Sequence, residues 1–346
     1  MIFFRSDYSQ GAHPKVLDAL VRTNMEHSDG YALDEHCENA RCMIKKLIGR
    51  EDCDVHLMVG GTPANITLIS AALRPYQAAV APIGGHIYSH ETGAVEATGH
   101  RIIAMQDEDG KLTPELIDRA WDQFEDEHTV IPKLAYISNA TENGSIYTKA
   151  ELVALSEACK KRDMYLYMDG ARIGTALTCD ENDLTLADIA EYTDAFYIGG
   201  TKNGALMGEA LVIMNEEINK DFRWMIKQNR GLLAKGRLLG VQFEALLEGG
   251  EDSVFFEMAR HSNAMAKKLK AGLEELGLKF FGTSVTNQIF PIVPVEVARE
   301  LAKDYLFYEW TPEKDGEVVI RLVTAWGTTE EEVEAVLASI KELLNK

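Results

Sequence analysis

The stretch Asp194-Ala195-Phe196-Tyr197-Ile198-Gly199-Gly200-Thr201-Lys202-Asn203-Gly204 carries an apolar run into a glycine-rich turn around one lysine. The run Ala195–Gly199 has the length and apolarity of a buried strand. Glycines after such a strand let the backbone approach a ligand closely, and a lysine there can form a Schiff base if burial or nearby charge lowers the pKa of its amine. Taken alone, the segment more often means a surface lysine in a turn, and it does not match the GxxxxGK[ST] phosphate loop.

On both sides of this stretch, apolar runs of strand length alternate with helix-like segments. Seven runs have this character: Val55–Val59, Ala78–Pro82, Arg101–Met105, Leu134–Ser138, Tyr165–Asp169, Ala195–Gly199 and Leu211–Met214. Such alternation predicts an α/β layer built on a mostly parallel, seven-stranded sheet. Helix starts are legible in between, with proline at a first helical position in Thr113-Pro114 and capping-box spacing in Thr148-x-x-Glu151.

After Glu216 the pattern changes. We expect long helices through Lys227–Glu248 and Ser253–Leu276, short strands near Ile289–Val293 and Val318–Val323, and a final helix from about Thr328. This predicts a large domain over residues 1–248 and a smaller C-terminal α+β domain over residues 249–346. The sequence leaves open whether the first dozen residues pack with the small domain.

The composition points to a folded, soluble protein. The chain has 346 residues, of which 46% are hydrophobic and 26% charged, and a net charge of -20. This charge disfavours nucleic acid and anionic membranes as partners, since no basic cluster offsets it. The five cysteines form no CxxC pair, the start turns polar too soon for a signal peptide, and no apolar run approaches the roughly 20 residues of a spanning helix. We therefore expect a cytoplasmic protein without a membrane partner.

Three other strand ends carry residues that complement Lys202. Asp169, in Tyr167-Met168-Asp169-Gly170-Ala171-Arg172, could keep a pyridine nitrogen protonated, although a strand-end Asp often only starts a turn. Gly60-Gly61-Thr62, with Thr62 as the expected helix cap, could bind a phosphate through backbone N–H groups and the helix dipole. His86 could lie flat on the pyridine ring and exchange protons near the reacting carbon.

Because ligands of open α/β sheets bind at the carboxyl ends of the strands, these segments together predict a pyridoxal 5'-phosphate (PLP) site. Neither a dinucleotide nor a metal fits as well: the glycines do not form GxGxxG, and His86 and His90 have no HExxH pattern or evident third ligand. We expect cofactor contacts from Gly60, Gly61, Thr62, His86, Asp169, Arg172, Thr201 and Lys202. Of these, Lys202, His86 and Asp169 are the candidate catalytic residues.

The order of these segments resembles fold-type I PLP enzymes, and more closely the low-specificity L-threonine aldolase and β-eliminating lyase family. The resemblance covers nearly the whole chain. It is carried by Phe4-Arg5-Ser6-Asp7-Tyr8, Gly60-Gly61-Thr62-Pro63-Ala64-Asn65, His86-Ile87-Tyr88 with Glu91, Asp169-Gly170-Ala171-Arg172 and Gly200-Thr201-Lys202. It implies the aspartate-aminotransferase-like fold, and a homodimer or homotetramer with active sites at the subunit interface.

The resemblance also implies roles for residues outside the four strand ends. Ser6, Arg172 and Arg321 would grip the carboxylate of a small amino-acid substrate, which suits the planar fork of arginine. Tyr31 would line the site. The basic residues Lys227, Arg230, Lys235 and Arg237 would reach a neighbouring subunit's phosphate, or else line a solvent face or a structural contact.

The resemblance implies a PLP-dependent aldolase that cleaves L-threonine or L-allo-threonine to glycine and an aldehyde. Two alternatives stay open: a β-eliminating lyase or other amino-acid lyase of the same fold, and a binding protein that kept the fold without the activity. The segment Ser138–Gly144 departs from many family members, which often carry a histidine for the β-hydroxyl where this chain has Thr141-Glu142. The general base could then be His86, His90 or a bound water.

Overall fold

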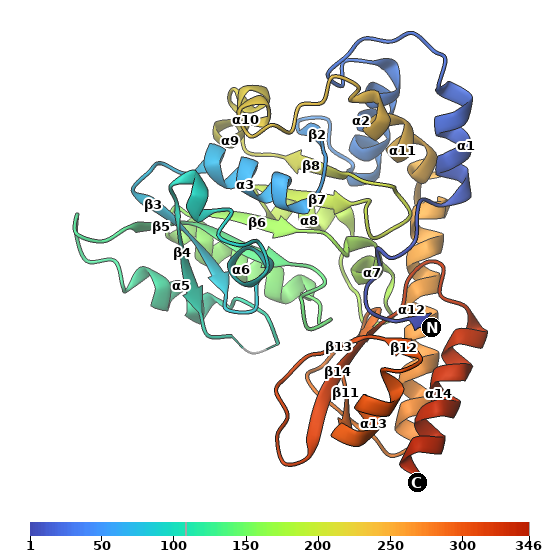
Figure 1. Ribbon diagram of the computed structural model, residues 1–346. Helices are drawn as coiled ribbons and strands as arrows, with labels where there is room; N and C mark the ends of the chain where they lie inside the picture. The colour runs from blue at the N-terminus through green and yellow to red at the C-terminus, as the bar shows by residue number, and fades with distance from the viewer. Residues whose placement is uncertain (108, 346) are drawn as a thin grey trace.

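The computed structural model describes residues 1–107 and 109–345 and contains a large α/β body with a smaller domain at one end (Figure 1). Seven strands form one sheet in the order β2-β8-β7-β6-β5-β3-β4. Only β8 runs against the others, because it pairs antiparallel with both β2 and β7. The bounds are β2 Asp54–Met58, β3 Gln77–Pro82, β4 Arg101–Met105, β5 Ile131–Ser138, β6 Tyr165–Asp169, β7 Ala195–Gly199 and β8 Glu209–Ile213.

These strands confirm the predicted mostly parallel, seven-stranded sheet. Helices cover both of its faces, so each strand sends alternate side chains into one of two cores. One core joins the sheet to α2 (Glu35–Ile48), α5 (Pro114–Trp121), α6 (Lys149–Lys161), α7 (Ile173–Thr178), α8 (Leu186–Tyr192) and α11 (Arg237–Leu247). The other joins it to α3 (Gly61–Ala72), α9 (Glu216–Asn219) and α10 (Phe222–Gln228). The remaining helices of this body are α1 (Pro14–Thr23) and the short α4 (His86–Ser89).

Local chemistry sets several helix starts. Pro114 opens α5 behind the capping residue Thr113, whose hydroxyl accepts the Leu116 N–H. Thr148 and Glu151 form the predicted capping box at the start of α6. Each cap satisfies N–H groups that have no partner inside the helix.

The small domain holds a five-stranded sheet in which β10, β14, β11 and β9 follow one another in that order and β13 also pairs with β14. Its bounds are β9 Lys279–Phe280, β10 Gln288–Ile289, β11 Pro291–Pro294, β13 Tyr308–Glu309 and β14 Glu317–Val323, packed with α13 (Val295–Leu301) and α14 (Glu330–Leu344). The N-terminal strand β1 (Ile2–Phe3) pairs in parallel with β12 (Tyr305–Leu306), and Phe4 is fully buried in this core. The N-terminus therefore lies beside the small domain (Figure 1).

Helix α12 (Val254–Glu275) runs from the large body into the small domain (Figure 1). Near its start, Phe255 and Phe256 belong to a core of the large body. Further along, Leu269 and Leu273 belong to the core of the small domain. The two domains therefore share one helix.

The single helix predicted over Lys227–Glu248 is wrong. The chain leaves the helical conformation between α10 and α11, where Arg230 has a positive φ of 66°. Gly236 lies so close to Ala32 that a Cβ there would meet the Ala32 backbone nitrogen at 2.5 Å. This close approach needs glycine, which also disfavours a helix interior. Among the described helices, none combines the length and apolarity that crossing a bilayer would require.

Candidate active site

The four predicted segments meet at one edge of the large sheet. Strands β2, β3, β6 and β7 all run in the same direction, so their carboxyl ends lie on the same side. Gly60-Gly61 follows β2, His86 follows β3, Asp169 ends β6 and Lys202 follows β7. The topology therefore gathers residues that are more than 100 positions apart in the chain.

Asp169 is buried, with 4% of its surface exposed, and its carboxylate accepts four hydrogen bonds. The donors are Tyr136 Oη at 2.7 Å, Tyr197 Oη at 2.5 Å, the Ala171 N–H at 3.0 Å and Asn65 Nδ2 at 3.2 Å. Burial pushes the pKa of Asp169 up, but the charge of His86 and these donors outweigh burial, and the net pKa lies below the usual value. The site thus holds a buried carboxylate in its ionised form.

Lys202 lies in the turn after β7, and among the described residues none accepts a hydrogen bond from its amine. Burial, followed by the charge of Arg172, lowers the pKa of Lys202, while the charges of Asp7, Asp169 and Glu209 oppose this shift. A lowered pKa increases the share of neutral, nucleophilic amine near neutral pH.

Glu209 at the start of β8 fixes this turn. Its carboxylate accepts the Gly200 N–H at 2.9 Å and the Thr201 hydroxyl at 2.7 Å, and Thr201 in turn accepts the Gly208 N–H at 3.0 Å. The Thr201 hydroxyl, predicted to contact the cofactor, is therefore engaged within the protein. Burial raises the pKa of Glu209 to about 7, against the opposing effects of Thr201 and Lys202.

Helix α3 begins at Gly61 rather than after Thr62, so the expected threonine cap is wrong. Gly60 occupies the cap position and has no side chain with which to cap the helix. The first-turn N–H groups of Gly61 and Thr62 thus point out of the helix without an intrahelical acceptor. A Cβ at Gly61 would lie 3.0 Å from the Tyr197 hydroxyl, so glycine keeps this approach open. Uncapped N–H groups at a helix start suit a phosphate.

His86 is half-buried at the start of α4, and its Nδ1 lies 2.8 Å from Glu91 Oε1. Burial lowers the pKa of His86, but the hydrogen bond to Glu91 and the charge of Asp169 raise it above the usual value. Asn65 Nδ2 also donates to Glu91 Oε1, at 2.7 Å, which ties Glu91 to the same network as Asp169. Glu91 therefore fixes the orientation of the His86 imidazole. His90 stacks on His86 with ring centroids 5.6 Å apart.

Arg172, at the end of the Asp169 segment, is paired with Asp7 from the N-terminal segment. Arg172 Nε and one terminal nitrogen donate to the two Asp7 oxygens at 2.7 and 3.1 Å, and only 10% and 2% of the two side chains are exposed. Asn287 Nδ2 adds a third donor to Asp7 at 3.0 Å. One edge of the guanidinium is thus used by the protein, which leaves the opposite edge for a carboxylate ligand.

Arg321 reaches the same region from β14 in the small domain. Its guanidinium lies 5.1 and 5.0 Å from the ring centres of Tyr308 and Trp310, and its buried Nε has no hydrogen-bond partner among the described residues. Burial and then the charge of Arg172 lower the pKa of Arg321. Two guanidinium groups that repel each other in this way would be stabilised by an anion between them.

Two further predicted residues, Ser6 and Tyr31, lie outside the strand ends. The Ser6 side chain is buried next to Asp7 and shares a hydrogen bond of 2.9 Å with Ser9. Tyr31 is exposed on the connection between α1 and α2, with Lys227 Nζ 4.8 Å from its ring centre. Among the described residues, no hydrogen bond or ring contact joins Tyr31 to the four strand ends. Of the other basic residues, Arg237 donates to the carbonyls of Thr23 and Glu26.

Sequence reasoning missed several residues that shape this site: Asp7, Asn65, Tyr136, Glu142, Tyr197 and Glu209. In the sequence, the tyrosines look like ordinary core residues of strands. Their role depends on the strand register, which sets Tyr136 opposite Tyr167 and so brings Tyr136 beside Asp169. Asp7 and Glu209 are far in sequence from the residues they hold. One sequence signal was available for the tyrosines: side chains alternate along a strand, which places Tyr167 and Asp169 on one face of β6.

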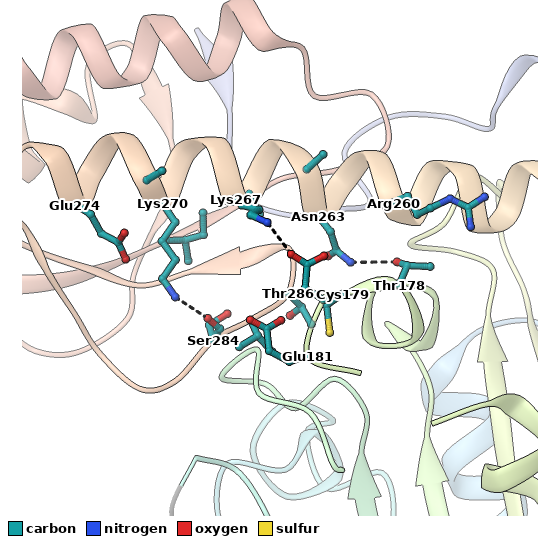
Figure 2. A pocket seen from close by; sticks show the side chains of 16 residues that line it. Thr178, Cys179, Glu181, Arg260, Asn263, Lys267, Lys270, Glu274, Ser284 and Thr286 are labelled. Carbon is teal, nitrogen blue, oxygen red and sulfur yellow. Dashed lines mark hydrogen bonds and ion pairs between the residues drawn. The ribbon is translucent and has the colours of Figure 1, made fainter. Parts of the chain in front are cut away.

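A separate cavity of about 580 Å³ lies between α12 and the segments around Thr178 and Ser284. Figure 2 shows Asn263 hydrogen-bonded to Thr178 and Lys270 to Ser284 across it. Lys267 also pairs with Asp180. None of the predicted site residues lines it. The residues at the sheet edge thus form a different site from this cavity at the domain junction.

Comparison with known proteins places this geometry in a family. The family model described as beta-eliminating lyase matches residues 4–295. A low-specificity L-threonine aldolase from a Pseudomonas strain is 31% identical over 350 residues, which cover 99% of this chain and 98% of that protein. The solved structure of a Leishmania major threonine aldolase is 48% identical, with a TM-score of 0.97 over 99% of this chain and 100% of that one.

The fold extends to more distant enzymes. Thermus thermophilus aspartate aminotransferase is 18% identical and aligns with a TM-score of 0.74 over 99% of this chain and 91% of its own. This likeness confirms the predicted aspartate-aminotransferase-like fold. The family and the fold are PLP-dependent, and the chain belongs to the beta-eliminating lyase family.

Proposed function

We propose that this protein is a PLP-dependent aldolase that cleaves β-hydroxy-α-amino acids, with L-threonine and L-allo-threonine as substrates, into glycine and an aldehyde. The proposal rests mainly on two residues at the same sheet edge. The Lys202 amine has a lowered pKa and no hydrogen-bond acceptor among the described residues, and the Asp169 carboxylate is ionised. The names of the relatives, threonine aldolases from Pseudomonas and Leishmania major, support the choice of substrate.

The residues present fit PLP. Lys202 would hold its aldehyde carbon, Asp169 would face its ring nitrogen, and the N–H groups of Gly61 and Thr62 would bind its phosphate. His86 would lie against the ring face, in an orientation kept by Glu91. When bound, PLP supplies an electron-accepting ring that stabilises the negative charge left on the substrate Cα as a bond to that carbon breaks.

The protein's own contribution is to choose which bond breaks. Arg172 would bind the substrate carboxylate with the edge that Asp7 leaves free, and Arg321 and Ser6 would complete the grip. Fixing the carboxylate orients the substrate about its Cα, and such positioning is a large part of catalysis. Asp7 thus acts as a positioning residue for Arg172.

We further propose a cytoplasmic homo-oligomer, a dimer or tetramer, whose active sites lie at the subunit interface. Large apolar side chains are exposed on the large body, among them Met25 at 84%, Val21 at 77% and Trp224 at 75%. A symmetric partner would cover such side chains. Tyr31 and Lys227, which stack on each other at the surface, would then reach the neighbouring site. All five cysteines are free thiols, in keeping with a reducing compartment.

A β-eliminating lyase is the second candidate, favoured by the description of the family model. It would use the same cofactor contacts but remove the Cα proton and expel a group from Cβ. Its products would be a keto acid and ammonia instead of glycine and an aldehyde.

The test is to incubate the purified protein with PLP and separately with L-threonine, L-allo-threonine and L-serine, and to identify the products. We expect glycine and acetaldehyde from the first two. Keto acid and ammonia would establish the lyase instead. In Lys202→Ala, we expect loss of the absorption band of lysine-bound cofactor and of turnover, and full turnover in this variant would refute the site.

A further inference from the structure

Glu142 is a half-buried residue beside the site that no step described so far uses. It follows β5, which lies between the strand that leads to His86 and the strand that ends in Asp169. Its Oε1 accepts the His86 backbone N–H at 2.9 Å and the Ser138 hydroxyl at 2.9 Å. Its Oε2 is buried and has no hydrogen-bond partner among the described residues.

An unpartnered buried oxygen is costly, and in a native site it calls for an explanation. The two donors on Oε1 fix the plane of the carboxyl group, so Oε2 keeps one direction. The titratable groups that interact with the charge of Glu142 are Asp169 on β6, His86 on α4, Arg172 before α7, and the buried tyrosines Tyr136 and Tyr147. Glu142 is thus hydrogen-bonded to the His86 backbone and lies within electrostatic reach of the guanidinium that would hold a substrate carboxylate.

The surroundings raise the pKa of the Glu142 carboxyl group above its usual value. Burial and then the charge of Asp169 raise the pKa of Glu142, while Ser138 and His86 oppose this shift. A raised pKa brings a carboxyl group closer to the range in which a general base is efficient.

We propose that Glu142 Oε2 accepts the proton of the substrate's β-hydroxyl group and is the general base for cleavage of the Cα–Cβ bond. This inference rests on the proposed aldolase function and deepens it. The substrate hydroxyl would give Oε2 the partner that the protein does not provide.

The step balances without a further reactant. The hydroxyl O–H bond breaks, its proton passes to Glu142, and its electron pair forms the carbonyl bond of the departing aldehyde. The Cα–Cβ bond breaks and its electron pair stays on Cα. Cα then takes up a proton, which gives glycine, and Glu142 releases its proton to solvent before the next turnover.

The experiment compares two reactions of the holoenzyme in wild type and Glu142→Gln. One is cleavage of L-allo-threonine and L-threonine. The other is exchange of the glycine Cα hydrogen with deuterium oxide, followed by NMR, which uses the cofactor and Lys202 but involves no hydroxyl group. Glutamine can keep both hydrogen bonds on Oε1, so the substitution removes mainly the proton acceptor.

We expect cleavage to fall by about 100-fold or more, the usual effect of losing a general base, while glycine exchange stays within a few-fold of wild type. Glu181→Gln, an exposed residue that lines the cavity of Figure 2, serves as the matched control and should change neither rate. Equal loss of both reactions in Glu142→Gln would overturn the proposal, because Glu142 would then only position the site. Unchanged cleavage would overturn it as well.

The pH profile separates the roles further. Cleavage by wild type should fall on the acidic side as Glu142 becomes protonated, and Glu142→Gln should lack this dependence in its residual activity. Glu142→Asp should restore part of the cleavage rate, because it restores a carboxylate. Failure of the aldolase function itself would be seen in wild type, which would then cleave no β-hydroxy-α-amino acid, and the inference would fall with it.

Discussion

The Asp7 carboxylate holds the Arg172 guanidinium along one edge, with two hydrogen bonds of 2.7 and 3.1 Å between residues 165 positions apart. The pair ties the N-terminal segment, which packs on the small domain through Phe4, to the end of the Asp169 segment in the large body. Burial opposes ionisation of Asp7, yet the charge of Arg172 keeps the pKa of Asp7 below its usual value. The proposed substrate grip is therefore assembled from both domains.

Asp7→Asn should weaken both stability and substrate binding. Arg172 would keep its buried charge without a counter-ion, and breaking a buried pair in this way costs about 3–5 kcal/mol. We expect a lower free energy of unfolding in urea and a higher KM for the amino acid. The control is Asp180→Asn, whose ion pair with Lys267 is exposed on both sides and should contribute nothing measurable. Equal stability of Asp7→Asn and wild type would contradict the buried pair.

The hydrogen bonds on Asp169 should set the acidic limit of glycine Cα-hydrogen exchange, the reaction that does not need Glu142. Asp169→Asn cannot carry the charge that the ring nitrogen requires, and loss of such a partner lowers turnover by about 100-fold or more. Because the pKa of Asp169 is lowered, its carboxylate becomes protonated only when the pH falls through this lowered pKa. Tyr197→Phe removes one donor and should move the acidic limb of the glycine-exchange profile to higher pH. Tyr167→Phe should move it less, because that hydroxyl donates to Asn65.

Glu209 should make the stability of the cofactor-free protein depend on pH. Its pKa rises from 4.5 to about 7 on folding, so between these values the folded chain holds a proton that the unfolded chain has released. The free energy of unfolding should therefore fall as the pH rises through this window, by about 3 kcal/mol in total from this group. Urea unfolding from pH 5 to 7.5 should show a shallower decline in Glu209→Gln. Identical slopes would argue against a shifted Glu209.

Gly170 should tolerate no side chain. A Cβ there would lie 1.8 Å from the Tyr197 carbonyl oxygen, which is part of strand β7 and cannot move aside freely. We expect Gly170→Ala to lose at least about 1–3 kcal/mol of stability, the usual cost of overpacking, and to fold poorly. Gly11→Ala is the matched control, since a Cβ there meets nothing within 4 Å. A melting temperature for Gly170→Ala equal to that of Gly11→Ala would contradict this packing.

The strands of the large sheet could be predicted from sequence because each is a short apolar run between turn residues. The expected Tyr165–Asp169 and Ala195–Gly199 match β6 and β7 at both ends. The helix break near Gly236 was missed although Gly231 and Gly236 both disfavour a helix interior, and its second reason, the approach of Ala32, lies some 200 residues away in the chain. Local patterns carry no information about such contacts.

The same limit applies to the site. Residues at strand ends, such as Asp169 and Lys202, could be proposed because the direction of a parallel sheet determines where they meet. The partners that tune them could not. Glu209 beside Lys202, and Asp7 beside Arg172, depend on the antiparallel placement of β8 and on the path of the N-terminal segment.

Helix α12 has a mechanical consequence. At 22 residues it is a rod of about 33 Å, anchored by Phe255 and Phe256 at one end and by Leu269 and Leu273 at the other. Arg172 and Arg321 sit on opposite sides of the junction that this rod crosses. The distance between the two guanidinium groups therefore depends on the stiffness of this helix, and in the proposed enzyme a substrate carboxylate that does not fit this distance would bind weakly.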